Sequence, residues 1–239
     1  MPASAGRNAQ AASLLAACLM AAALAWPARA QDQAPLASLT LGHAGNDRRV
    51  ALVRNLAAGP VEIQLELPEA SNIATIPEFP LRLVLAAGEE RPVATLAQRS
   101  HHAGQFSLRM ATVPGPPGAV HTDPHYRFPL PADADWTLAQ GFHGPFSHDD
   151  LQNRYALDLA VAEGTPVLAA RAGTVFALET GFTDGGLDRA RHLGRANYVR
   201  ILHEDGSMAV YAHLQPVTAV LPGERVEAGQ VIGYSGNTG

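Results

Sequence analysis

Short runs in which apolar and polar residues alternate recur along the chain, and this pattern restricts the fold more than any other feature. The clearest run is Val61 to Leu67, where Glu62, Gln64 and Glu66 separate the apolar residues. Alternation with a period of two is typical of a strand with one buried face, because successive side chains of a strand point to opposite faces. No segment has a convincing helical period. The sequence therefore predicts an all-β protein.

The first half of the chain predicts a small antiparallel N-terminal β-sandwich over residues 38–130. Its apolar runs are short, and turns rich in Gly, Pro and Asn separate them, which is the spacing expected of a sandwich. The best runs are Val50 to Leu56, Val61 to Leu67, Leu81 to Leu85, Phe106 to Ala111 and Tyr126 to Leu130. Three Pro and two Gly mark Val113 to Ala119 as an internal loop. Pro129 to Asp135 is the better linker to a second domain.

This second domain is predicted to be a β-domain over residues 136–239. Its clearest strands are Val167 to Leu178, Asn197 to His203 and Met208 to Leu214. Glu204, Asp205 and Gly206 form a Gly-containing turn between the last two, so we expect these strands to pair as a hairpin. The C-terminal part is therefore expected to be an antiparallel β-sheet domain.

Residues 1–30 have the layout of a signal peptide. Arg7 lies in a short polar start, an apolar run extends from about Ala11 to Trp26, and Ala28-Arg29-Ala30 is a small-x-small cleavage site. We expect export to the periplasm or the outside, with no stable transmembrane segment after cleavage, because the run is shorter than the roughly 20 residues that span a bilayer. An alternative is a lipoprotein signal that ends at Cys18.

Composition excludes some functions. The chain is 239 residues long and 47% hydrophobic, enough for a substantial core. Its formal net charge is -5 and it has no basic stripe, so nucleic acid is not an expected partner. The only cysteine, Cys18, lies in the predicted signal peptide, so catalysis in the mature protein would use other groups.

The polar residues that could bind a metal or take part in catalysis lie in the second half. They are His148, Asp158, His203 and His213. Zinc hydrolases use three protein ligands drawn from His and Asp or Glu and leave a position for water, so metal chemistry is the leading hypothesis. A period of two places Asp158 on one face with two alanines, which leaves room for an ion, and places His213 on one face with Tyr211.

The second half also resembles the lysostaphin or LytM-type zinc peptidases. The matching segments occur in order: Ser147-His148, Asn153 to Ala160, Gly164 to Val167, Ala169 to Val175, Asn197 to His203, Tyr211 to Leu214, Gly229-Gln230 and Ile232 to Gly239. The resemblance implies a LytM-type, duplicated-hybrid-motif-like β-sheet domain that uses Zn²⁺ to cut peptide cross-bridges of peptidoglycan. It also implies that Asp158 is a zinc ligand and that His213 is an unliganded catalytic histidine.

The first metal ligand departs from the common pattern of that family. In most members a His lies four residues before the Asp, where this chain has Arg154. We therefore transfer the ligand role to His148, ten residues before Asp158, with His143 as the alternative. The family's third ligand belongs to a C-terminal His-x-His. Ser235 to Gly239 matches the stretch that leads into it, so we expect that motif to come after Gly239.

Other polar residues receive structural interpretations. His203 is expected to be an exposed turn residue, and His121 and His125 are expected to lie in a solvated loop. The charged loop from Gly181 to Ala196 either lines a substrate groove or is simply solvated. The sequence thus favours an exported zinc endopeptidase. The alternatives are a degenerate LytM-type module that binds and regulates a cell-wall hydrolase, and an exported β-sandwich binding protein.

Overall fold

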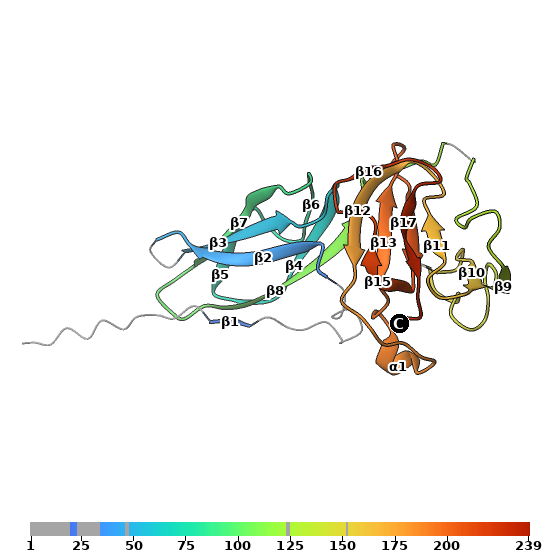
Figure 1. The fold of residues 1–239 in the computed structure, drawn as a ribbon. Coiled ribbons are helices and arrows are strands. Elements are labelled where there is room, and N and C mark those ends of the chain that lie inside the picture. The colour runs from blue at the N-terminus through green and yellow to red at the C-terminus, as the bar shows by residue number, and fades with distance from the viewer. Residues whose placement is uncertain (1–19, 23–33, 46–47, 123–124, 152) are drawn as a thin grey trace, which may run out of the picture.

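The computed structural model describes residues 20–22, 34–45, 48–122, 125–151 and 153–239 (Figure 1). Strands make up nearly all of its regular structure. Within these ranges the one helix is α1, Arg189–His192, which has four residues. The prediction of an all-β fold is confirmed.

The N-terminal half contains two four-stranded sheets, in the orders β1-β8-β4-β6 and β2-β3-β7-β5. Their strands are β1 Met20–Ala22, β2 Ala37–His43, β3 Arg48–Asn55, β4 Val61–Ser71, β5 Ile73–Ile76, β6 Leu81–Leu85, β7 Glu90–Gln98 and β8 Gln105–Pro114. All pairings are antiparallel except β1 with β8, which is parallel. The two sheets lie together on one side of the molecule in Figure 1.

Strand β4 shows how the alternating pattern positions the core of this half. Val61, Ile63 and Leu65 are completely buried, as their period predicts. Glu62 on the other face is also buried, and its cross-strand neighbours are Val84 on β6 and Val113 on β8. An ion pair with Arg82 Nε at 3.0 Å compensates this carboxylate.

The C-terminal half contains three smaller sheets, in the orders β10-β9, β11-β17-β15 and β14-β13-β12-β16. Their strands are β9 Trp136–Gln140, β10 Asp158–Val161, β11 Pro166–Leu168, β12 Gly173–Glu179, β13 Tyr198–Leu202, β14 Met208–Ala212, β15 Leu214–Thr218, β16 Arg225–Val226 and β17 Val231–Ser235. All their pairings are antiparallel. Strands β13 and β14 form the predicted hairpin.

Two predicted strands differ from the structure. Val167 to Leu178 is divided into β11 and β12, because the backbone at Ala169 and Ala170 bonds to Gln230 and Arg127 instead of continuing one ladder. Tyr126 to Leu130 was expected to be a strand and is irregular. Proline at position 129 has no N–H to donate, which interrupts a ladder at that point.

One side chain of β12 belongs to the core of the N-terminal half. Phe176 is completely buried in a cluster with Val53, Val61 and Ile63. A Cβ added at Gly59 would come within 2.7 Å of the Phe176 ring, so glycine at that position lets the chain pass close to β12. The two halves therefore share apolar packing, and the domain limits 38–130 and 136–239 stay predictions.

The predicted signal peptide, residues 1–30, lies outside the described residues except for β1. In the described ranges no helix is long and apolar enough to cross a membrane.

Candidate active site

His148 and Asp158 meet at the start of β10. His148 Nε2 lies 3.1 Å from Asp158 Oδ1. The imidazole is 3% exposed, whereas 42% of the Asp158 side chain is open to solvent. The structure thus brings the two predicted metal ligands into direct contact at a partly open position.

Strand pairing and one glutamine hold the carboxylate in place. Asp158 is paired with Gln140 across β10 and β9. Gln140 Nε2 donates to Asp158 Oδ2 at 3.1 Å and to Ser147 Oγ at 2.8 Å. A Cβ at Gly144 would lie 2.1 Å from Gln140 Cγ, so a larger residue at that position would displace this side chain. Gln140 therefore orients Asp158 and the loop that carries His148.

The hydrogen bond on the far side of His148 fixes its tautomer. Nδ1 lies 2.7 Å from the Gly141 carbonyl oxygen. Since a carbonyl only accepts, Nδ1 carries a hydrogen, and in the neutral ring Nε2 then presents a lone pair to the Asp158 oxygen. Two lone pairs at 3.1 Å repel each other, so this contact requires either a proton on Nε2 or a cation between the two atoms.

The donor set suits a zinc ion. Zn²⁺ takes imidazole nitrogen and carboxylate oxygen as ligands, and a ligating His commonly donates its other N–H to a carbonyl. His148 and Asp158 meet both conditions. Within the part of the chain that the structure describes, no group of three His, Cys, Asp or Glu side chains is placed to hold a metal. The described residues thus offer two candidate donors.

His213 lies directly after β14 in a backbone conformation that is rare for such a residue. Its φ is 59°, in the left-handed region, and its side chain is exposed. Nδ1 donates to the Thr238 carbonyl at 2.6 Å, which leaves the neutral ring with an accepting Nε2. Uncommon backbone conformations of this kind cluster at functional sites. His213 is therefore oriented as a proton acceptor.

The ends of three strands connect the region of His213 to that of Asp158. Ser235 Oγ at the end of β17 donates to the carbonyl of Ala162, the residue directly after β10. Gly236 N donates to the carbonyl of His213, at 2.9 Å. No hydrogen bond or ion pair among the described residues joins His213 itself to His148 or Asp158. The structure places these described residues near connected strand ends, without a hydrogen bond or ion pair between His213 and the other two.

The expected strand faces hold only in part. Asp158 is the first residue of β10, so Ala156 lies outside the strand, and a register shift occurs directly after Asp158. Strand β14 ends at Ala212, so His213 does not continue the face of Tyr211 as predicted. Its positive φ turns the chain away from that face.

The alternative ligand His143 has a different environment. Its ring packs edge-on against Tyr155 with centroids 5.1 Å apart, and its backbone N–H donates to the Arg154 carbonyl. It makes no ion pair with Asp158, whose histidine contact is His148. His148, and not His143, is thus the histidine in contact with Asp158, and its role as a ligand stays a prediction.

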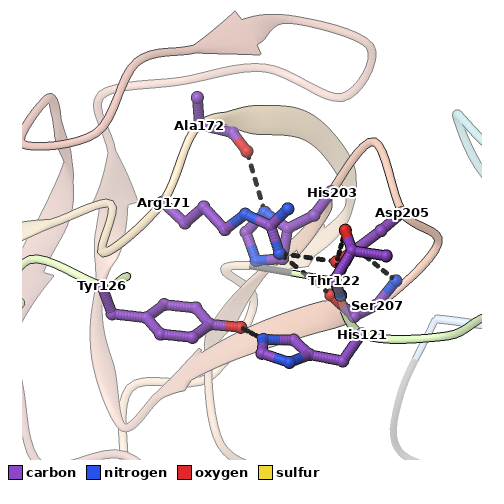
Figure 2. A network of polar contacts seen from close by, with 8 residues as sticks. All are labelled: His121, Thr122, Tyr126, Arg171, Ala172, His203, Asp205 and Ser207. Atoms are coloured by element: carbon purple, nitrogen blue, oxygen red, sulfur yellow. Dashed lines mark hydrogen bonds and ion pairs between the residues drawn. The ribbon is translucent and has the colours of Figure 1, made fainter. Parts of the chain in front are cut away.

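His203 was expected to be an exposed turn residue, and this prediction is wrong. Its side chain is 3% exposed, and Nδ1 donates to the Ala172 carbonyl at 2.8 Å. Tyr126, distant in the sequence, packs edge-on against its ring (Figure 2). Burial lowers the pKa of His203. Packing by this distant segment, which the local pattern cannot reveal, buries the turn.

His203 belongs to a polar network centred on Asp205, seen in Figure 2. Arg171 Nη1 lies 2.8 Å from Asp205 Oδ2, which also accepts from the N–H of Thr122. Ser207 donates to Oδ1 through its N–H and its hydroxyl. The Ser207 hydroxyl, the Thr122 N–H and Arg171 together hold the pKa of Asp205 far below its usual range. The network therefore bonds Thr122 to the turn between β13 and β14 through Asp205.

The remaining polar segments have structural partners. His121 is exposed, stacks on Tyr126 and shares a hydrogen bond with its hydroxyl. In the loop from Gly181 to Ala196, Asp184 forms ion pairs with two arginines, and Arg195 lowers its pKa. This loop also bonds to the last residue, Gly239, through Asp184 and Gly186.

Sequence reasoning missed the groups that orient the candidate residues. Gln140 was not singled out, and the carbonyls of Gly141 and Thr238 that fix the two imidazoles have no sequence signature. Backbone acceptors of this kind depend on loop geometry. The pairing of Gln140 with Asp158 across β9 and β10, which was not predicted from the sequence, would have pointed to the glutamine.

Residues 152–239 match the model of peptidase family M23. The chain is 36% identical over 88 residues to glycyl-glycine endopeptidase ALE-1 of Staphylococcus capitis, a match that covers 36% of this chain and 21% of that protein. It is 33% identical over 113 residues to peptidoglycan DD-endopeptidase ShyA of Vibrio cholerae, which covers 46% of this chain and 23% of that protein. The chain thus spans less than a quarter of either relative's length.

A crystal structure described as a peptidase M23 from Pseudomonas aeruginosa is also similar to this chain. The likeness covers 77% of this chain and 83% of the other, at 17% sequence identity and a TM-score of 0.30.

Proposed function

Because residues 152–239 match the model of peptidase family M23, we propose that the protein is an exported zinc endopeptidase that hydrolyses peptide cross-links of peptidoglycan. One similar protein is named a glycyl-glycine endopeptidase and the other a peptidoglycan DD-endopeptidase. Both names describe hydrolysis of peptide bonds, and the second names peptidoglycan, from which the proposed substrate class is taken. Export to the periplasm or the outside would bring the enzyme to that substrate.

The contact between His148 and Asp158 carries the proposal. Nε2 and Oδ1 approach to 3.1 Å while Nδ1 donates to the Gly141 carbonyl, so in the neutral ring two acceptors face each other. A proton on Nε2 would relieve that repulsion, and so would a cation bound by both atoms, which is the state that we propose. His148 Nε2 and Asp158 Oδ1 are therefore the proposed zinc ligands in this chain, and further ligands would complete the coordination.

Zinc bound there would polarise a carbonyl group and lower the pKa of a coordinated water toward neutrality. The chain's own residues orient the reaction. Gln140 holds the Asp158 carboxylate through Oδ2, which leaves Oδ1 directed at His148. His213 keeps Nε2 as a proton acceptor because Thr238 occupies Nδ1, so it would take a proton from the attacking water and later return one to the leaving amine.

The test uses purified cross-linked peptidoglycan and the full chain. We expect added zinc to support release of cleaved cross-bridge peptides, and excess chelator followed by dialysis to stop it. Adding zinc back should restore release. The Asp158→Asn variant keeps the size of the side chain and removes its charge, so it should release no peptide above background.

Two outcomes would contradict the proposal. If the chain binds cross-linked peptide but neither takes up zinc nor cleaves it, the protein is a non-catalytic module that binds the wall or a cell-wall hydrolase. If Asp158→Asn retains wild-type release, cleavage depends on another site.

A further inference from the structure

A wide cavity opens beside His148 and contains an arginine. Its volume is about 840 Å³, and it is lined by His143, His148, Asp149, Asp150, Leu151 and Arg154. Since His148 is a proposed zinc ligand, a peptide cut at this site would extend into the cavity. The residues that line it are therefore positioned to select the substrate.

Aromatic packing holds Arg154 at the edge of this cavity. The guanidinium carbon lies 5.0 Å from the centroid of the Tyr155 ring. Tyr155 in turn packs edge-on against Phe142 and His143. The backbone of Arg154 is also fixed, since its N–H donates to the Asp150 carbonyl at 3.0 Å and its carbonyl accepts from His143 N. The side chain is thus held in position before any ligand arrives.

The hydrogen-bonding capacity of Arg154 is largely unused. Its Nε is buried and has no hydrogen-bond partner among the described residues. The guanidinium forms no ion pair with a described carboxylate, although Asp149 and Asp150 line the same cavity. Asp150 instead accepts from the N–H and side-chain amide of Asn153, at 2.8 and 2.9 Å. A stacked guanidinium keeps its in-plane N–H donors for another acceptor.

A carboxylate is the group that best fits such a guanidinium. Arginine presents planar N–H donors that match the two oxygens of a carboxylate, and such charge-assisted hydrogen bonds are stronger than neutral ones. In a cross-link through D-residues, the residue on the amine side of the scissile amide can carry a free α-carboxylate beside that bond. The interior of a glycine bridge offers no such charge.

We propose that Arg154 binds a substrate carboxylate adjacent to the scissile amide, so that this chain prefers cross-links with that charge to neutral glycine bridges. The inference rests on the proposed function for its substrate class. It assigns to Arg154, at the position where the common family pattern has a metal ligand, a role in choosing the bond.

The test compares two peptides that differ only in this charge, N-acetyl-D-alanyl-D-alanine and its C-terminal amide. We expect zinc-loaded wild-type chain to cleave the acid with a kcat/KM about 10- to 100-fold above that of the amide. Arg154→Gln should bring the ratio close to 1, and Arg154→Lys should keep part of it. Arg91→Gln, in the N-terminal half, is the control and should leave the ratio unchanged.

A binding measurement separates this inference from the proposed function. NMR titration of chelator-treated protein with each peptide reports carboxylate recognition without turnover. Tighter binding of the acid, lost in Arg154→Gln, supports the inference even if neither peptide is cleaved, in which case the proposed function fails. Equal binding of acid and amide by the wild type, or a preference that survives in a folded Arg154→Gln variant, overturns it. Thermal unfolding checks that the variant is folded.

Discussion

Two polar clusters in the C-terminal half combine histidine with a carboxylate, yet they differ in how completely their hydrogen bonds are satisfied. Around Asp205, both oxygens accept from several donors, and only 4% of the side chain is exposed. At Asp158, one oxygen accepts from Gln140 and the other faces Nε2 of His148, with 42% of the side chain exposed. A carboxylate whose hydrogen bonds are all made, such as Asp205, fits a structural role. A partly exposed carboxylate with an oxygen left to bind another group, such as Asp158, fits ligand binding.

The two histidines of the β13–β14 hairpin repeat the contrast. His203 and His213 each donate Nδ1–H to a backbone carbonyl. Nε2 of His203 is buried without a partner among the described residues, whereas His213 has a positive φ and an exposed ring. Both histidines therefore have the same tautomer, but the accepting Nε2 points into the protein in His203 and toward solvent in His213. Only the outward acceptor can reach a substrate.

The largest expected effect is a difference in turnover between variants of these two histidines. His213→Gln removes the proposed proton acceptor, so kcat for cross-link cleavage should fall about 1000-fold while zinc affinity is retained. His203→Gln is the matched control, and its folded fraction should keep most of its turnover. Peptide release and zinc content measure the two effects. Full activity of His213→Gln would show that the outward acceptor has no catalytic role.

The next largest effect is a difference in thermal stability between variants of the two carboxylates, Asp205 and Asp158. Asp205→Asn leaves Arg171 without its charged partner and weakens bonds to Thr122 and Ser207, so thermal unfolding should shift down by on the order of 5 °C. Asp158→Asn should change the unfolding temperature little in zinc-free protein, because the side chain is 42% exposed and the Asn amide can donate to Nε2 of a neutral His148. Scanning calorimetry measures both. The comparison fails if Asp158→Asn is the more destabilised variant.

The smallest effect concerns pH. Burial lowers the pKa of His203, so the unfolded chain protonates near pH 6.5 while the folded chain stays neutral, and stability falls as pH drops below about 6.5. The pKa of Asp205 is also lowered, so its contribution is present above about pH 4 and is lost as pH falls through the folded value. Urea unfolding from pH 8 to 3 measures both windows.

Variants assign each window to its group. His203→Gln should flatten the dependence just below pH 6.5, and Asp205→Asn should flatten the dependence below about pH 4. An unchanged slope in either variant would mean that another group controls that window.

The sequence predicted the parts of the fold that depend on local pattern. The hairpin of β13 and β14 and the buried side of β4 result from alternation and a Gly-containing turn. The division of β11 from β12 and the burial of His203 were not predictable in this way, because Arg127, Gln230 and Tyr126 cause them from distant positions. A pattern within a few residues contains no information about such partners.

The candidate site was predictable to a different extent. Its residue types and order came from the resemblance to a peptidase family, and their metal and catalytic roles stay predictions. The structure adds the contact of His148 with Asp158 and the carbonyls that set both tautomers. It also adds Arg154 beside the cavity, a residue that sequence reasoning treated only as a lost ligand.

Zinc affinity of matched histidine variants tests the central claim most directly. Competition with a chromophoric chelator at neutral pH would compare the wild-type chain with His148→Gln and with His143→Gln, the variant of the alternative ligand. We expect His148→Gln to weaken zinc binding at least about 100-fold and His143→Gln to leave it within a few-fold of wild type. Wild-type affinity in His148→Gln, or the greater loss in His143→Gln, would contradict the assignment of the metal centre.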